Sequence, residues 1–98
     1  MPYNALVIIS FRHKGLADLW NVGHSSKLDA RLVPRILRRL DAIEAAVRIE
    51  DLTVPGFDFH ALKGFNPKRY TIHVNGPWCI TFEFADGEAT GLSLEQYH

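Results

Sequence analysis

The chain has 98 residues, of which 47% are hydrophobic and 22% charged, and its formal net charge is zero. This length predicts one domain over residues 1–98 without an internal ligand chamber, so any site is expected to be a shallow surface groove. A single cysteine, Cys79, excludes an internal disulfide, and no Cys/His cluster has zinc spacing, so no metal or cofactor is expected.

The distribution of charge and apolar residues bears on location and partners. The apolar stretch at residues 5–9 is too short for a membrane span or a signal-peptide core, so a cytoplasmic protein without membrane contact is expected. Residues 1–39 carry seven Lys/Arg and two Asp (+5), whereas residues 40–98 carry four Lys/Arg and nine Asp/Glu (−5). This asymmetry favours a polyanionic partner on one side, although a solvated helix face gives the same pattern.

Two helices are expected after a first strand. The β-branched run at residues 4–11 predicts a strand buried on both faces. Residues 13–21 show helical spacing and are followed by Gly23, which predicts a short helix that ends there, with a turn at residues 24–27. A longer apolar stripe runs from about residue 28 to residue 47, in which Pro34 must mark either the start of the helix or a kink.

Four arginines of this second helix are expected on the face opposite its apolar stripe: Arg31, Arg35, Arg38 and Arg39. Like charges one turn apart cost a few tenths of a kcal/mol each. The arrangement is consistent with an anionic partner and with an ordinary solvated face, and the sequence leaves both open.

The second half of the chain has the period of strands. After a loop at residues 48–56, alternation predicts strands at 57–62, 69–74, 78–84 and 92–97, with hairpin turns at Asn75-Gly76 and Asp86-Gly87. The predicted fold class is α+β: one strand, two helices, and then an antiparallel β-meander packed against the helices.

Matching the apolar faces of the strands predicts their register. Ile72 should pair with Ile80, Val74 with Trp78, Phe82 with Leu92 and Ile80 with Leu94, with three-residue loops in both hairpins. On the polar face, His73 should then lie across from Cys79, Cys79 across from Glu95, and Arg69 across from Glu83.

Three segments, taken in order, resemble HigB-type toxins of the RelE/ParE superfamily. They are Phe11-Arg-His-Lys-Gly15; residues 52–64, with Pro55-Gly-Phe and His60-Ala-Leu-Lys-Gly64; and Val74-Asn-Gly-Pro-Trp78 with Ile80-Thr-Phe82. The closing Tyr97-His98 also matches. The resemblance implies a small RelE-like fold and a ribosome-dependent endoribonuclease that cuts messenger RNA in the A site. It also implies a helix-turn-helix antitoxin as partner, and contact with operator DNA only through the toxin–antitoxin complex.

RNA cleavage without a metal needs a base for the 2′-hydroxyl proton, an acid for the leaving oxygen, and cations for the charge on phosphorus. His60 is the best candidate for proton transfer, because its parity in the strand places it opposite the core. The family position supports it. The expected catalytic residues are His60, Tyr97 and His98, and the expected substrate-binding residues are Lys63, Arg69, His73 and Gln96.

The sequence departs from the family at three positions. His73 and Cys79 stand where such toxins usually carry arginines, and Gln96 stands where an acidic residue is usual. A second hypothesis is therefore a catalytically weakened module that binds its antitoxin and acts in operon autoregulation. A third is the gyrase-poisoning branch of the superfamily, which the His60 and Tyr-His pattern disfavours.

Overall fold

The computed structural model describes residues 7–96, which form two α-helices, a 3₁₀ helix and a sheet. The elements are α1 (Lys14–Val22), α2 (Val33–Ala45), η1 (Ile49–Leu52), β1 (His60–Leu62), β2 (Arg69–Asn75), β3 (Trp78–Ala85) and β4 (Glu88–Gln96). The strands form one antiparallel sheet in the order β1-β2-β3-β4. The predicted α+β fold with a β-meander is confirmed.

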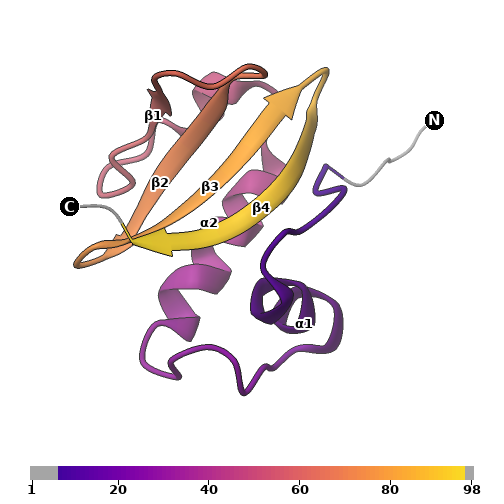
Figure 1. The fold of residues 1–98 in the computed structure, drawn as a ribbon, viewed down its shortest axis with the longest axis vertical. Helices are drawn as coiled ribbons and strands as arrows, with labels where there is room; N and C mark the ends of the chain where they lie inside the picture. Colours follow the sequence, from indigo (N-terminus) through magenta and orange to yellow (C-terminus); the bar gives the residue numbers. More distant parts are fainter. Residues whose placement is uncertain (1–6, 97–98) are drawn as a thin grey trace.

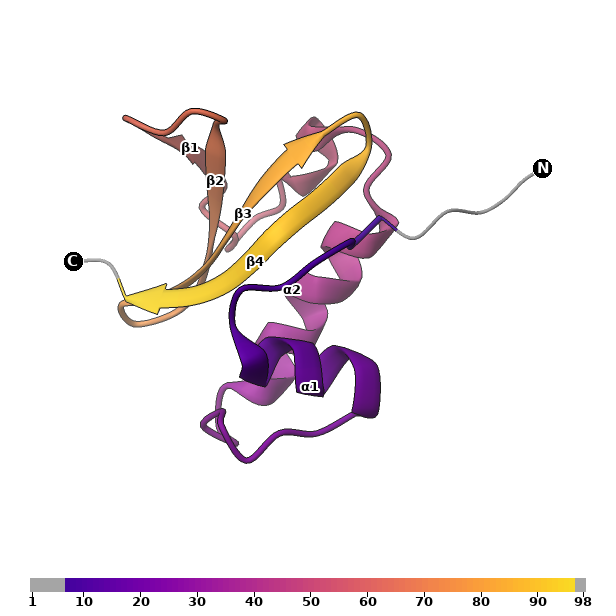
Figure 2. The ribbon, with the colours of Figure 1, turned by 45° about the vertical axis from the view of Figure 1, so that its right-hand side comes forward.

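The sheet has one face toward the helices and one face away from them. Figure 1 shows α2 crossing behind the sheet and α1 beside its lower part, and the turned view in Figure 2 keeps both helices on that side. The segment that precedes α1 runs beside β4 in both views. The opposite face of the sheet carries no helix, so it is open to hold a surface site.

Local sequence sets the helix ends as predicted, apart from the last turn of α2. The Nδ1 atom of His13 accepts a hydrogen bond from the backbone of Leu16 at 3.3 Å, and Gly23 (φ 99°) ends α1 in the left-handed conformation. Pro34 lies in the first turn of α2, where its missing N–H costs nothing. The expected helix to residue 47 is too long, because α2 ends at Ala45 and Val47 is 79% exposed.

The expected first strand is only partly correct. Residues 4–6 lie outside the described residues. Residues 7–12 run parallel to β4, joined by backbone hydrogen bonds such as Ile9 N to Ala89 O (2.8 Å), but they form isolated bridges instead of a continuous strand. Burial on both faces is wrong: Ile8 reaches the core, whereas Ile9 is half exposed, because the segment lies at the sheet's edge.

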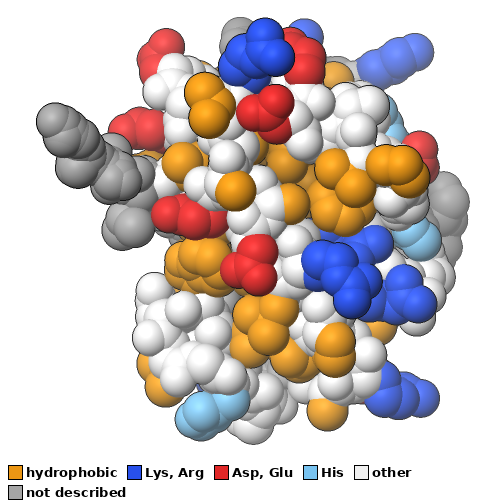
Figure 3. Space-filling model, turned by 180° about the vertical axis from the view of Figure 1, so that it is seen from behind, with side chains coloured by type: hydrophobic (Ala, Val, Ile, Leu, Met, Phe, Trp, Pro, Cys, Tyr) orange, Lys and Arg blue, Asp and Glu red, His pale blue; other side chains and the backbone are white. Residues whose placement is uncertain are grey.

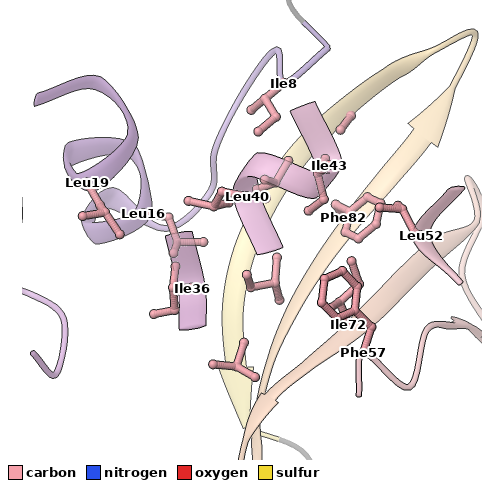
Figure 4. Close-up of a cluster of buried hydrophobic side chains, with 14 of the residues drawn as sticks. Ile8, Leu16, Leu19, Ile36, Leu40, Ile43, Leu52, Phe57, Ile72 and Phe82 are labelled. Carbon is pink, nitrogen blue, oxygen red and sulfur yellow. The ribbon is translucent and has the colours of Figure 1, made fainter. Parts of the chain in front are cut away.

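The core lies between the helices and the apolar face of the sheet. Figure 4 shows Ile36, Leu40 and Ile43 of α2 facing Ile72 and Phe82 of the sheet. All five side chains are fully buried. The stripe predicted from the helical period is therefore the face that α2 presents to the sheet.

The basic face of α2 holds two of its four expected arginines, because Arg31 lies before the helix begins at Val33. Arg31, Arg35 and Arg38 are exposed, and Arg31 pairs with Asp29 at 2.9 Å. Seen from the helix side, Lys and Arg side chains gather beside the region of α2 (Figure 3). The expectation that Arg39 lies on this exposed face is wrong. Its side chain is buried, donates to the carbonyl of His73 at 2.8 Å and lies over the ring of Phe57.

The register agrees with the prediction away from the hairpin turns and differs next to them. The polar-face pairs His73–Cys79, Cys79–Glu95 and Arg69–Glu83 are confirmed, as are Ile72–Ile80 and Ile80–Leu94. The expected three-residue loops are wrong, because Asn75 pairs with Trp78 and Ala85 with Glu88, leaving two residues in each loop. A bulge near each turn absorbs the difference: Val74 is extra in β2, and Phe82 faces two residues of β4.

Candidate active site

The face of the sheet without helices carries three cross-strand rows of side chains, all of them polar except Leu62. The register places His60, Thr71, Thr81 and Ser93 in one row, Leu62, Arg69, Glu83 and Thr90 in a second, and His73, Cys79 and Glu95 in a third. Paired residues in a sheet point to the same side, so these rows share one face. We call this surface, defined by these residues, the polar face.

His60 lies at the edge of the polar face. It is the first residue of β1, pairs with Thr71 and is exposed. Its Nδ1 atom lies 2.8 Å from the carbonyl oxygen of Asp58. The predicted position of His60 opposite the core is confirmed. Diagonal neighbours on paired strands lie roughly 7–8 Å apart, which places His73 within reach of the same substrate.

His73 and Cys79 face each other on adjacent strands, as the register predicted. The Nε2 atom of His73 lies 3.0 Å from the carbonyl oxygen of Gly76 in the hairpin turn. Cys79 is partly exposed, and its neighbour in the row, Glu95, accepts a hydrogen bond from the Thr81 hydroxyl at 2.7 Å. The two positions at which the resemblance in the sequence predicts arginines are therefore adjacent.

Arg69 is buried, which the sequence did not predict. Its guanidinium donates to Glu83 (3.3 Å), to the Thr81 hydroxyl (3.1 Å) and to the carbonyl of Gly91 (3.0 Å). Its side chain is 4% exposed. The expectation that Arg69 is an open phosphate ligand is corrected: its donors tie β2 to β3 and β4 beneath the polar face.

Exposed cations remain near this face. Lys63 is exposed in the turn that follows β1. Arg12, whose side chain is 58% exposed, reaches Glu83 at 3.5 Å and thus joins the polar face from the segment beside β4. Sequence reasoning missed Arg12, although it belongs to the Phe11-Arg-His-Lys-Gly15 segment that carried the family resemblance.

Of the predicted site residues at the chain end, the structure describes only Gln96. Gln96 is exposed and pairs with Trp78, so in the strand it lies on the opposite side from Glu95 and away from the third row. Tyr97 and His98 lie outside the described residues. β4 ends beside the hairpin turn between β2 and β3, so the strand leads toward the end of the sheet that carries His73 (Figure 1).

A surface hollow of about 400 Å³ lies at the hairpin between β3 and β4 and shares Glu83 and Thr90 with the second row of the polar face. Its lining includes Glu83, Asp86, Glu88 and Lys68. Three carboxylates and one amine repel phosphate, so this hollow does not suit RNA. The part of the polar face that carries His60 and His73 remains the better candidate.

Residues 7–96 have neither a metal-binding cluster of side chains nor a membrane-spanning helix. No group of three or more His, Cys, Asp or Glu side chains in that range could hold a metal ion. None of the helices in that range has the length and apolar character needed to cross a bilayer.

Comparisons with known proteins agree with the resemblance in the sequence. Residues 9–98 match the family model described as the RelE-like toxin of type II toxin–antitoxin system HigB. The chain is 41% identical to an endoribonuclease HigB of Proteus vulgaris over 92 residues, covering 94% of this chain and 100% of that protein. It is 30% identical to an uncharacterized protein of Haemophilus influenzae over 89 residues, covering 89% of this chain and 88% of that one.

Proposed function

The chain belongs to the family of HigB RelE-like toxins of type II toxin–antitoxin systems, and on that premise we propose that it is a ribosome-dependent endoribonuclease that cleaves messenger RNA. The observation that carries the proposal is His60, an exposed imidazole on the polar face, at the position the family resemblance marks. In this proposal the protein acts in the cytoplasm, where it enters the ribosomal A site.

The proposed reaction is an intramolecular transesterification of the RNA, in which the phosphoryl group passes from one oxygen to another. His60 takes the proton of a ribose 2′-hydroxyl, whose oxygen attacks the adjacent phosphorus and displaces the 5′-oxygen of the next nucleotide. A group at the chain end, His98 or Tyr97, returns a proton to that leaving oxygen. The products are a 2′,3′-cyclic phosphate and a free 5′-hydroxyl, and no metal takes part.

Cations stabilise the charge that develops on the phosphoryl oxygens. Lys63 and Arg12 are exposed and lie at the polar face or beside it, so they are the proposed ligands of the phosphate. His73 adds a third donor to the substrate when protonated. Arg69 contributes indirectly, because it holds the strands that carry these groups.

The test is growth on induction of the toxin in cells. We expect His60→Ala and deletion of Tyr97-His98 each to relieve growth arrest and to abolish cleavage of a reporter transcript in primer extension. His24→Ala is the matched control, because His24 is exposed in the loop after α1 and is expected to leave toxicity unchanged. Full toxicity of both site variants, with purified proteins as stable as wild type, contradicts the assignment.

The replaced arginines favour a second candidate function. His73 and Cys79 face each other, so two fixed guanidinium groups are missing from one patch of the polar face. Under this alternative the chain binds a helix-turn-helix antitoxin, and the complex represses its own operon, while cleavage is weak. Translation arrest by this chain alone, without antitoxin, supports the nuclease; operon repression with no arrest supports the alternative.

A further inference from the structure

Asp58 adopts an unusual backbone conformation two residues before His60. Among the described residues other than glycine, Asp58 (φ 46°) and Asp86 (φ 55°) are those with positive φ. Asp86 lies in the two-residue turn between β3 and β4, where such a conformation is required. Asp58 lies outside any hairpin turn, and strain at such a position is often stored at functional sites.

The residues on either side hold Asp58 in this conformation. Phe57 is buried, its N–H donates to Val54 O at 3.0 Å, and its carbonyl accepts from the backbone of His73 at 2.6 Å. Phe59 stacks on the ring of Tyr70, with centroids 5.4 Å apart. Because both neighbours are fixed on the sheet, Asp58 absorbs the change of chain direction, and β1 begins at His60 instead of residue 57.

This conformation aims the Asp58 carbonyl at the imidazole of His60. The oxygen lies 2.8 Å from Nδ1. A carbonyl oxygen can only accept, so Nδ1 must carry the proton, and in the neutral ring the lone pair is then on Nε2. Within residues 7–96, Nε2 of His60 has no hydrogen-bond partner in the structure. The ring is thus held as a base that can accept a proton at Nε2, because Nδ1 is engaged with the Asp58 carbonyl.

We propose that Asp58 is a positioning residue whose left-handed backbone fixes the tautomer of His60, leaving Nε2 as the proton acceptor toward the RNA 2′-hydroxyl. The catalytic part of this inference rests on the proposed function. The side chain of Asp58 has no part in it: aspartate serves here because it tolerates positive φ better than most residues, and asparagine and glycine tolerate it as well.

The proposal predicts a pattern across substitutions. Asp58→Gly and Asp58→Asn keep the backbone conformation, so we expect RNA cleavage within about twofold of wild type. Asp58→Val disfavours positive φ, which displaces the carbonyl. We expect a loss of cleavage of roughly 10- to 100-fold, less than the roughly 100- to 10,000-fold that general acid–base catalysis contributes, because the imidazole itself is retained. Asp86→Val is the matched control, since it imposes a similar backbone penalty at the distant hairpin turn.

The direct readout is ¹⁵N NMR of the imidazole nitrogens at alkaline pH, where the ring is neutral, in protein labelled at histidine. The spectrum of His60, assigned by its loss in His60→Ala, should show the proton on Nδ1 in wild type, Asp58→Gly, Asp58→Asn and Asp86→Val. Asp58→Val should move the proton toward Nε2, the form that free imidazole side chains prefer.

The outcomes separate this inference from the proposed function. A wild-type His60 protonated on Nε2, or an Asp58→Val protein that remains folded and retains the Nδ1 proton, overturns the inference whatever the cleavage assay gives. An Nδ1-protonated His60 in wild type, lost in Asp58→Val, upholds the inference. If His60→Ala is at the same time fully active, the proposed function fails while the tautomer assignment stands.

Discussion

At the scale of single residues, the sequence predicted which face a side chain occupies better than how deeply it is buried. Alternation placed His60 and Arg69 correctly on the side away from the core. It could not predict that Arg69, Thr71 and Thr81 are almost fully buried there, because that depends on side chains reaching across from other strands and from Arg12. The left-handed backbone conformation of Asp58 could not be predicted either, since it is imposed by neighbouring residues that are fixed on the sheet.

Thr71 carries a buried hydroxyl without a partner in the described part of the chain. An unsatisfied buried polar group costs about 1–3 kcal/mol, so Thr71→Val should raise the free energy of unfolding by about 1 kcal/mol in urea titrations. Thr81→Val is the control, for which the free energy of unfolding is expected to change in the opposite direction. Its hydroxyl donates to Glu95 and accepts from Arg69, so its loss should lower that free energy by roughly 1–3 kcal/mol. A loss of stability in Thr71→Val contradicts the assignment.

Asp51 should contribute a pH-dependent part of the stability. Hydrogen bonds from the backbone N–H groups of Arg48 and Val47 hold the pKa of its carboxyl below the ordinary value of 3.8. A lowered folded-state pKa means that the contribution is fully present above pH 3.8 and is lost as the pH falls through the folded value. Asp51→Asn should therefore be less stable than wild type at pH 6, and the difference should shrink as the pH falls below 3.8, measured by thermal unfolding across that range. A difference that is independent of pH contradicts this origin.

At the scale of secondary-structure elements, the mid-strand register and the places of the hairpin turns were predictable, whereas the loop lengths were not. Matching apolar faces fixes which residues pair in mid-strand, because a slip of one residue would expose the core. It does not fix loop length, since a bulge can absorb one residue. Both hairpins use that freedom, at Val74 and opposite Phe82, so the predicted pairs of the polar face are found despite wrong loops.

The bulge in β4 depends on Gly91. Its φ is +63°, and a Cβ there would lie 3.2 Å from Arg12 Nε and 3.4 Å from Arg69 Nη1. Gly91→Ala should therefore lower the free energy of unfolding by more than the roughly 1–2 kcal/mol expected from the backbone alone. Gly76→Ala measures the backbone part, because Gly76 has φ +57° and open space around its Cβ position. Equal losses in the two variants would show that the arginine contacts are unimportant.

Arg39 joins α2 to β2. A helical wheel placed it on the basic face, but the wheel describes one helix and cannot show that the sheet extends over this position. Burial, together with repulsion from Arg35 and Arg38, lowers the pKa of the Arg39 guanidinium. The carbonyl of His73 nevertheless depends on it. Arg39→Met should lower the free energy of unfolding by about 1–3 kcal/mol, whereas Arg38→Met, at an exposed position, should change it by less than about 0.5 kcal/mol.

At the scale of the whole molecule, the fold places core and candidate site on opposite sides of one sheet. The helices cover one face, and the residues of the polar face lie on the other, while Lys and Arg side chains gather on the helix side (Figures 1 and 3). Periodicity was enough to predict this division of the sheet. It did not predict that Arg12 joins the polar face, because Arg12 meets Glu83 through a tertiary contact.

The segment at residues 7–12 also has a consequence for how copies of the protein behave toward one another. β4 is the longest strand and lies at the margin of the sheet, where unpaired N–H and C=O groups invite a strand from another molecule. Backbone bonds from residues 7–12 occupy part of that margin, while the opposite margin, β1, has only three residues. The protein thus limits fibre-like stacking at both margins, by covering one and shortening the other.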